Sequence, residues 1–103
     1  MEDTEMTINK KLEENVCTLE IGGRLDTVTA PELESVLKEI PAEVTKLVLD
    51  FKELEYISSA GLRVLLSAQK AMNRQGEMVV CNVNEVVMDV FSITGFTEIL
   101  TIA

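Results

Sequence analysis

The chain has 103 residues, 47 % of them hydrophobic, which suits one folded domain with a single core and argues against disorder. Eighteen Asp and Glu residues against nine Lys and Arg residues give a formal charge of −9, which disfavours nucleic acid and anionic membranes as partners. No apolar run approaches the roughly 20 residues that span a bilayer. The acidic start lacks the order of a signal peptide, so we expect a cytoplasmic protein.

The first predicted elements are two strands, 6–10 and 16–21, in which apolar and polar residues alternate. The polar segment 12–15 between them has the length of a hairpin turn. We therefore expect these two strands to pair antiparallel. The acidic residues 1–5 that precede them are expected to be loose.

A first helix is expected to start at Thr29, which precedes Pro31. The face that packs on the sheet should consist of apolar residues at helical spacing, namely Leu33, Val36, Leu37 and Ile40. Pro41 should end this helix. The near-continuous apolar run at 46–51 then indicates a central strand that is covered on both faces.

A second helix is expected over about 60–73, followed by a mostly apolar strand at 77–83. Asn84 should cap a third helix, and Gly95 should close it. The inner face of this third helix should consist of Val86, Val87, Val90 and Phe91. The segment 96–102 is predicted to be a last short strand.

The predicted order of elements is β-β-α-β-α-β-α-β, which makes residues 1–103 a single α/β domain. We expect a mixed sheet with helices packed against one or both faces. Cys17 and Cys81 each lie in an apolar strand segment, so both should be buried. Two thiols without a histidine are too few for a zinc site, and no metal is expected.

Two serines stand where the chain passes from a strand into the second helix. Ser58 and Ser59 fit the ordinary role of a helix cap, in which a side-chain oxygen accepts an unpaired backbone N–H. A helix start also stabilises a negative group, so a phosphoserine would fit there. Gly61 lacks a side chain, which would let another backbone or a protein partner approach closely. The residues alone leave both interpretations open.

Catalysis is not expected. The chain contains no histidine, so Ser-His-Asp and Cys-His mechanisms are excluded and Ser59 is a poor hydrolytic nucleophile. Carboxylate pairs, such as Glu13 with Glu14 and Glu53 with Glu55, fall in polar stretches where solvated charge is the expected role. The glycine-rich loops that hold phosphates in nucleotide enzymes are absent, and no cofactor is expected.

The segment 57–66, Ile-Ser-Ser-Ala-Gly-Leu-Arg-Val-Leu-Leu, resembles the phosphorylation-site segment of anti-sigma factor antagonists, which are stand-alone bacterial STAS domains. Further segments resemble features of that family in the same order: the turn 23–26, the central strand 47–51, the strand 76–81 and the short helix 90–96. Many members have Asp-Ser-Ser-Gly where this chain has Ser-Ser-Ala-Gly, so the family aspartate is replaced by Ser58. Relatives usually continue into a final helix, and from these 103 residues we expect none after the last strand.

The resemblance implies a non-enzymatic switch. The unphosphorylated domain would bind an anti-sigma factor that is also a serine kinase. Phosphorylation of Ser59, with Ser58 as the second choice, would end the binding, and a serine phosphatase would restore it. The implied partner-binding residues are Asp26, Ser58, Ser59, Gly61, Leu62 and Arg63. Asp26 has the alternative role of stabilising a turn, and Arg63 that of a solvated helix position.

A second hypothesis is a constitutive binding or scaffold module of the same fold, in a sensory, transport or lipid-transport assembly. Ser58 and Ser59 would then serve only as caps.

Without a final helix, an apolar patch of Phe91, Ile93 and Phe96 would be exposed and could support a weak homodimer. The charge of −9 would attract a partner with a basic face.

Overall fold

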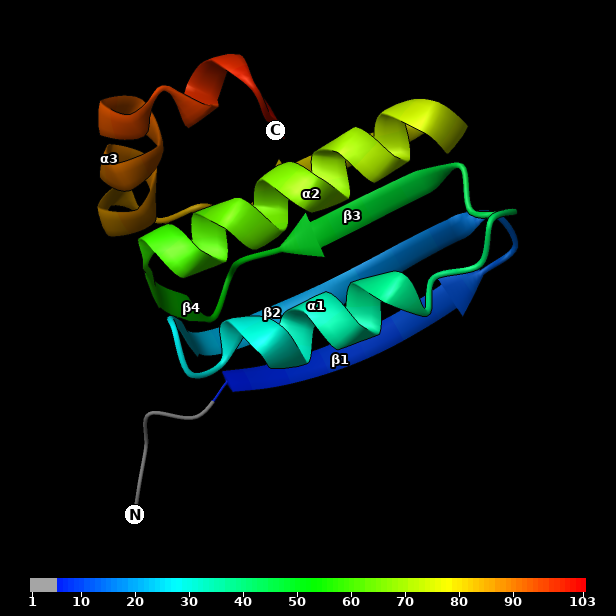
Figure 1. The fold of residues 1–103 in the computed structure, drawn as a ribbon, viewed down its shortest axis with the longest axis horizontal. Coiled ribbons are helices and arrows are strands. Elements are labelled where there is room, and N and C mark those ends of the chain that lie inside the picture. Colours follow the sequence, from blue (N-terminus) through cyan, green and yellow to red (C-terminus); the bar gives the residue numbers. More distant parts are fainter. Residues whose placement is uncertain (1–5) are drawn as a thin grey trace.

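The computed structural model describes residues 6–103, which form one mixed sheet of six strands with three α-helices (Figure 1). The strands are β1 Met6–Glu13, β2 Val16–Leu25, β3 Lys46–Asp50, β4 Leu54–Ile57, β5 Glu77–Cys81 and β6 Thr101–Ile102. The helices are α1 Ala30–Lys38, α2 Ser59–Gln75 and α3 Glu85–Thr94, with a short 3-10 helix, η1, at Phe96–Glu98. The predicted loose start concerns residues 1–5, which lie outside the described residues.

The sheet runs in the order β1-β2-β3-β5-β6, and β4 pairs with β2 beyond the point where β3 ends. Strands β1 and β2 pair antiparallel as predicted, with Ile8 opposite Ile21. The other neighbouring strands are parallel, so the chain must cross over between them. Helices α1, α2 and α3 supply these crossovers. The predicted α/β class with a mixed sheet is therefore confirmed.

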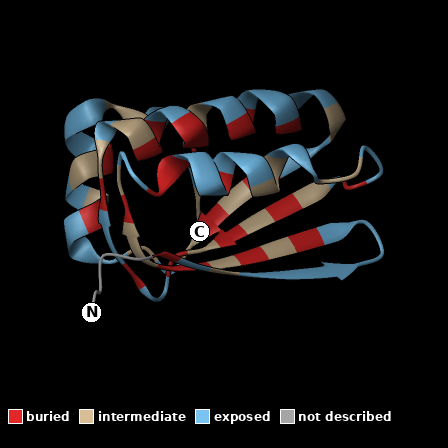
Figure 2. Cartoon of the chain, turned by 60° about the horizontal axis from the view of Figure 1, so that its bottom comes forward, coloured by how far each residue is buried: buried red, intermediate tan, exposed pale blue. Residues whose placement is uncertain are grey.

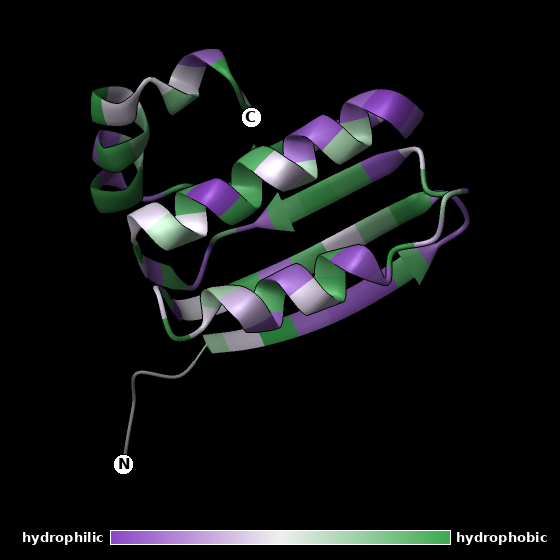
Figure 3. Ribbon diagram, viewed as in Figure 1, coloured by the Kyte–Doolittle hydropathy of each residue, from purple (hydrophilic) through white to green (hydrophobic). Residues whose placement is uncertain are grey.

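Helices α1 and α2 lie side by side on the same face of the sheet (Figure 2). In β3, which is largely hydrophobic in Figure 3, Leu47 and Leu49 are buried in the core, whereas Val48 between them is half-buried. The prediction that this central strand is covered on both faces is wrong. A continuous apolar run does not by itself reveal whether the second face is covered.

Local signals set most helix ends close to their predicted positions. Helix α2 covers the predicted 60–73 with one extra residue before it and two after it. Asn84 accepts the backbone N–H of Val87 at 2.8 Å, and Gly95 ends α3 with a φ of 82°, both as predicted. Helix α1, however, already ends at Lys38, ahead of the proline that was expected to end it.

The strand predictions differ from the structure at several points. Strands β1 and β2 extend past the predicted ends at 10 and 21 to Glu13 and Leu25, and β5 ends at Cys81 instead of 83. Strand β4 was not predicted. Its first and last residues are buried and the two between them are exposed, so its four residues do not show the alternation of apolar and polar residues that indicates a strand. The predicted strand 96–102 is divided into η1 and the two-residue β6. The backbone N–H of Glu98 donates to the Gly95 carbonyl oxygen at 3.1 Å, which closes a 3-10 turn directly after the left-handed glycine.

The burial of α3 and of the cysteines also differs from prediction. Val87 and Phe91 are fully buried as expected, but Val86 is 57 % exposed and does not belong to the inner face. Cys17 is buried as predicted, whereas Cys81 is only half-buried. Cys81 is the register partner of Asp50, which is also half-buried, at the ends of β5 and β3.

The predicted apolar patch is smaller than expected. The Phe91 ring is buried and stacks on the ring of the half-buried Phe96, with 6.4 Å between their centroids. Only Ile93 is strongly exposed, at 85 %. A homodimer contact at this place stays a prediction. Within residues 6–103 no α-helix follows β6.

The end of α2 is anchored to the loop that leads into β3. The side-chain amide of Gln75 donates to three backbone carbonyl oxygens, those of Pro41 at 3.1 Å, Ala42 at 3.3 Å and Val44 at 2.6 Å. The backbone N–H of Glu77, just beyond the helix, donates to the carbonyl oxygen of Thr45 at 2.9 Å. These contacts fix the far end of the helix whose start carries the two serines.

Candidate partner-binding site

Three segments meet at the carboxyl ends of the parallel strands: the end of β2, strand β4 and the start of α2. In the register of the sheet, Arg24 pairs with Tyr56 and Leu25 pairs with Ile57. The pairing continues one step into the helix start, because the backbone N–H of Ser58 donates to the Leu25 carbonyl oxygen at 2.9 Å. The turn after β2 is thereby held beside the serine pair.

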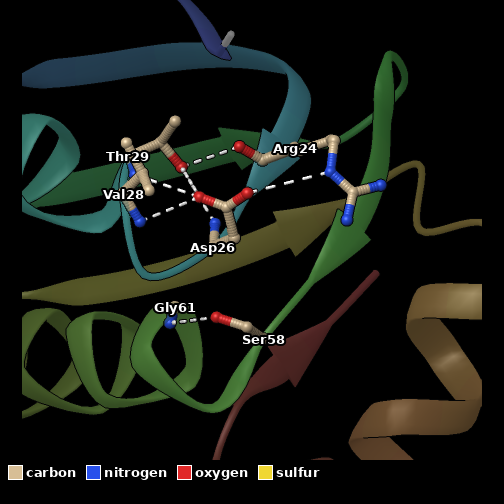
Figure 4. A network of polar contacts seen from close by, with 6 residues as sticks. All are labelled: Arg24, Asp26, Val28, Thr29, Ser58 and Gly61. Atoms are coloured by element: carbon tan, nitrogen blue, oxygen red, sulfur yellow. Dashed lines mark hydrogen bonds and ion pairs between the residues drawn. The ribbon is translucent and has the colours of Figure 1, made fainter. Parts of the chain in front are cut away.

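The two serines have different surroundings. Ser58 is the N-cap of α2, and its hydroxyl oxygen accepts the backbone N–H of Gly61 at 3.4 Å (Figure 4). Its own carbonyl oxygen accepts the backbone N–H of Leu62 at 2.9 Å. Ser59 is the first helical residue and is exposed, and among residues 6–103 its hydroxyl has no hydrogen-bond partner. The capping role predicted for this pair is confirmed for Ser58 alone.

Gly61 and Leu62 lie inside the domain. A Cβ atom on Gly61 would lie 2.7 Å from Leu25 Cγ and 2.9 Å from Ile57 Cγ1. Of the two approaches expected at Gly61, by another backbone or by a protein partner, the first is made by the chain's own strand, because the Leu25 carbonyl oxygen would lie 3.1 Å from that Cβ. Leu62 is only 7 % exposed. Contact of either residue with a partner stays a prediction, and in this conformation the two residues instead position the start of α2.

Asp26 stabilises the turn that follows β2, which confirms the turn-stabilising role that was one of its two predicted roles. One carboxylate oxygen accepts the backbone N–H groups of Val28 at 3.0 Å and of Thr29 at 3.1 Å (Figure 4). The bond from Thr29 is the main cause that holds the pKa of Asp26 below its ordinary value. Asp26 is therefore ionised at neutral pH, and its second oxygen faces Arg24, 3.7 Å from the guanidinium Nε.

Thr29 does not cap α1 with its side chain, contrary to what its place before Pro31 suggests. Its hydroxyl donates to the carbonyl oxygen of Arg24 at 2.7 Å and accepts the backbone N–H of Asp26 at 2.9 Å. Thr29 is almost fully buried, so these bonds satisfy a polar group that would otherwise be costly to bury. The side chain thus closes the turn instead of the helix.

Arg24 and Tyr56 are site residues that sequence reasoning missed. The guanidinium carbon of Arg24 lies 4.3 Å from the centre of the Tyr56 ring, which is a cation–π contact. Both side chains are partly exposed and lie beside the turn of Asp26. Their contact depends on the pairing of β2 with β4, and no local pattern in the sequence indicates that pairing.

Arg63 is exposed on α2, one helical turn after Ser59. Residues four apart lie on the same face of a helix, so these two side chains share one face. The first turn of α2 contains no acidic residue that would neutralise Arg63. A negative group attached to Ser59 would therefore meet both the helix start and a nearby basic side chain.

The described residues hold no group of three His, Cys, Asp or Glu side chains placed to bind a metal ion.

A cavity of about 250 Å³ lies on the open face of the sheet, where Glu20, Asp50 and Glu53 contribute carboxylates and Lys52 an ammonium group. Within residues 6–103, none of the helices combines the length and the apolarity that crossing a membrane requires.

Comparison with known proteins gives consistent matches over most of the chain. The sequence model of the STAS domain matches residues 7–103. BtrV of Bordetella bronchiseptica, by its name a candidate anti-sigma factor antagonist, is 42 % identical over 86 residues, which are 79 % of this chain and 72 % of that protein.

Two solved structures share the fold. An anti-sigma factor antagonist from Mycobacterium paratuberculosis superimposes with a TM-score of 0.87 at 22 % identity, over 96 % of this chain and 86 % of that one. SpoIIAA of Bacillus in its phosphorylated form has a TM-score of 0.73 at 16 % identity, over 94 % of this chain and 91 % of its own. With the family match over nearly its whole length, the chain belongs to the STAS domain family.

Proposed function

We propose that this domain is a cytoplasmic anti-sigma factor antagonist that works as a phosphorylation-switched binding module. Unphosphorylated, it binds an anti-sigma factor that is also a serine kinase. Phosphorylation of Ser59 releases that partner, and a serine phosphatase restores binding. The names of BtrV and of the Mycobacterium paratuberculosis protein support the first part of this proposal. The phosphorylated form of SpoIIAA, which has the same fold, supports the second part.

The observation that carries the proposal is the division of roles between the two serines. The hydroxyl oxygen of Ser58 already accepts the backbone N–H of Gly61, whereas the side chain of Ser59 is exposed and accessible to a kinase. A kinase that approaches the start of α2 would meet the Ser59 hydroxyl without breaking the helix cap. This supports Ser59 over Ser58 as the phosphate acceptor.

The electrostatics of a phosphate at this place favour a switch that keeps the fold intact. At a helix start the added charge of roughly −1.5 to −2 is stabilised by about 0.3 to 2 kcal/mol. In a tight protein interface, the same charge facing acidic or apolar groups costs several kcal/mol, and about 1.4 kcal/mol is a tenfold change in affinity. Phosphorylation would therefore change binding far more than stability.

The residues around Ser59 give the proposed interface its chemistry. Asp26 is held ionised by the turn that it builds, and positive charge comes from Arg24 beside it and from Arg63 one turn into α2. The fixed backbone of the turn and of the helix start presents these charges in a defined arrangement. Such preorganised charges favour selection among partners over raw affinity. The proposed action is binding, with no catalytic role for the domain itself.

Calorimetry tests the proposal with two preparations of the domain, one unphosphorylated and one phosphorylated by the candidate kinase. The unphosphorylated domain should bind the candidate anti-sigma factor, and the phosphorylated domain should bind it at least about tenfold more weakly. Ser59→Ala treated with kinase and ATP is the control and should keep full binding. Equal binding by both preparations would favour the constitutive module, and no binding by either would contradict the proposed partner.

A further inference from the structure

Helix α2 is charged differently from the rest of the molecule. It contains three of the nine basic residues and none of the eighteen acidic ones. Four of its exposed residues follow one another at spacings of four, three and four, which place these four on a single helix face. We call this face the α2 stripe; it consists of Arg63, Ser67, Lys70 and Arg74. A chain with a formal charge of −9 thus presents one basic surface.

The stability of the helix explains only part of this distribution, namely Arg74, which lies in the last turn, where the helix dipole favours a basic side chain. Arg63 lies one turn from the positive end of the helix dipole, where acidic side chains are the stabilising ones. Lys70 and Arg74 are like charges four residues apart, which destabilises a helix. Within the part of the chain that the structure describes, none of the three basic groups has a carboxylate within 4.0 Å. Residues that oppose local stability in this way are expected at functional surfaces.

A groove between α1 and α2 runs beside the stripe. Its part nearest to Ser59 has a volume of about 410 Å³ and is lined by Ala60, Arg63 and Lys70 of α2 and by Pro31 of α1. It continues into a part of about 280 Å³ that is lined mainly by apolar side chains, including those of Leu37, Ile40 and Met72. The two parts share Val64 and Ser67, so they form one groove.

The α1 side of the groove carries one acidic residue. Glu34 lines both parts, but its carboxylate lies 4.0 Å from the ammonium group of Lys38 on the same helix. The basic charges of the α2 stripe are therefore the main charges that a bound segment would meet. An apolar groove with one basic wall suits a segment that has apolar side chains on one face and carboxylates on another.

We propose that the α2 stripe and the adjoining groove bind an acidic, amphipathic segment of the protein partner. This inference rests on the proposed function, because it names the chemistry of that partner's surface. It also gives the switch a direct mechanism. Ser59 lies four residues before Arg63 on the same helix face, so a phosphate there repels the acidic segment and pairs with the basic group that would have held it.

The test uses a synthetic amphipathic peptide with Glu on one face and Leu on the other, titrated into the 15N-labelled domain. The peptide should shift the backbone amide signals of residues 63–74, and a peptide with Gln in place of Glu should bind about tenfold more weakly. Arg63→Glu/Lys70→Glu should lose these shifts. Both side chains are exposed, and a glutamate near the helix start favours the dipole, so this variant should keep its fold by circular dichroism.

Lys10→Glu/Lys52→Glu is the matched control. It changes the net charge by the same amount at two exposed positions outside α2 and its groove, and it should bind the peptide as the wild type does. Shifts that remain in Arg63→Glu/Lys70→Glu, or an acidic peptide that leaves 63–74 unshifted, would overturn the inference and leave the proposed function standing. Failure of the wild type to bind the anti-sigma factor in calorimetry would contradict the proposed function, while the peptide result still decides the inference.

Discussion

The backbone N–H of Ser58 donates a 2.9 Å hydrogen bond to the carbonyl oxygen of Leu25, which joins the start of α2 to the last residue of β2. The turn of Asp26 begins directly after Leu25, so this bond holds the turn and the helix start together. Ser59 is the next residue, and its side chain is exposed and takes no part in this contact. The molecule therefore supports an exposed hydroxyl on a fixed backbone.

Replacing Ser59 should separate binding from folding. Ser59→Asp should melt close to the wild-type temperature, because a carboxylate at a helix start is favourable, yet bind the anti-sigma factor at least about tenfold more weakly. Ser59→Ala should bind as the wild type does and resist phosphorylation. Circular dichroism melting and calorimetry measure the two properties. A grossly unfolded Ser59→Asp would argue against a switch that acts at the interface.

Gly61→Ala should lower stability. The added Cβ would lie within 3 Å of side-chain atoms of Leu25 and Ile57, and crowding in a packed core costs roughly 1–3 kcal/mol. Urea unfolding measures the loss. Ser67→Ala, an exposed position on the same helix, should change stability by less than about 0.5 kcal/mol. Unchanged stability of Gly61→Ala with weakened partner binding would instead restore the direct partner contact first expected for this glycine.

Gln75→Ala should also destabilise the fold, at the opposite end of α2. It removes the amide that donates to the carbonyl oxygens of Pro41, Ala42 and Val44. An unpaired, part-buried carbonyl costs about 1–3 kcal/mol, so the midpoint of urea unfolding should fall clearly. Arg74→Ala removes the neighbouring exposed side chain and is the control. An equal, small effect of both substitutions would show that the anchor contributes little.

Acid should weaken the turn of Asp26. Its folded pKa is lowered, chiefly by the N–H of Thr29, so its contribution is fully present above the unfolded pKa of about 3.9 and is lost as the pH falls through the folded pKa. Asp26→Asn keeps an acceptor oxygen but no titrating charge. Wild type should be the more stable of the two at pH 7, and the difference should shrink below about pH 4. A difference that is independent of pH would exclude this origin.

Much of the fold could be predicted from sequence because its signals are local. Asn84 and Gly95 bound α3 through contacts within one helical turn, and the alternation in β1 and β2 specifies the hairpin. The same holds for Ser58 as a helix cap, whose contact to Gly61 spans three residues. In each case the residue and its partner lie close together in the chain.

The rest of the site depends on contacts between distant segments. Arg24 meets Tyr56 only because β4 pairs with β2, and that short strand has no period of its own. The space at Gly61 is filled by Leu25, which sequence alone places thirty-six positions away with no sign of contact. The local sequence marks Thr29 as a helix cap, but its hydroxyl donates a hydrogen bond to the carbonyl oxygen of Arg24 instead. At each of these places a contact between distant segments determines the structure, and the local sequence does not reveal that contact.

The measurement that tests the central claim most directly is mapping of the phosphate by mass spectrometry. The domain is incubated with the candidate kinase and ATP, beside Ser58→Ala and Ser59→Ala. The account predicts a single phosphate on the wild type that persists in Ser58→Ala and disappears in Ser59→Ala. A phosphate that disappears only in Ser58→Ala, or no phosphate from a kinase that is demonstrably active, would contradict the account.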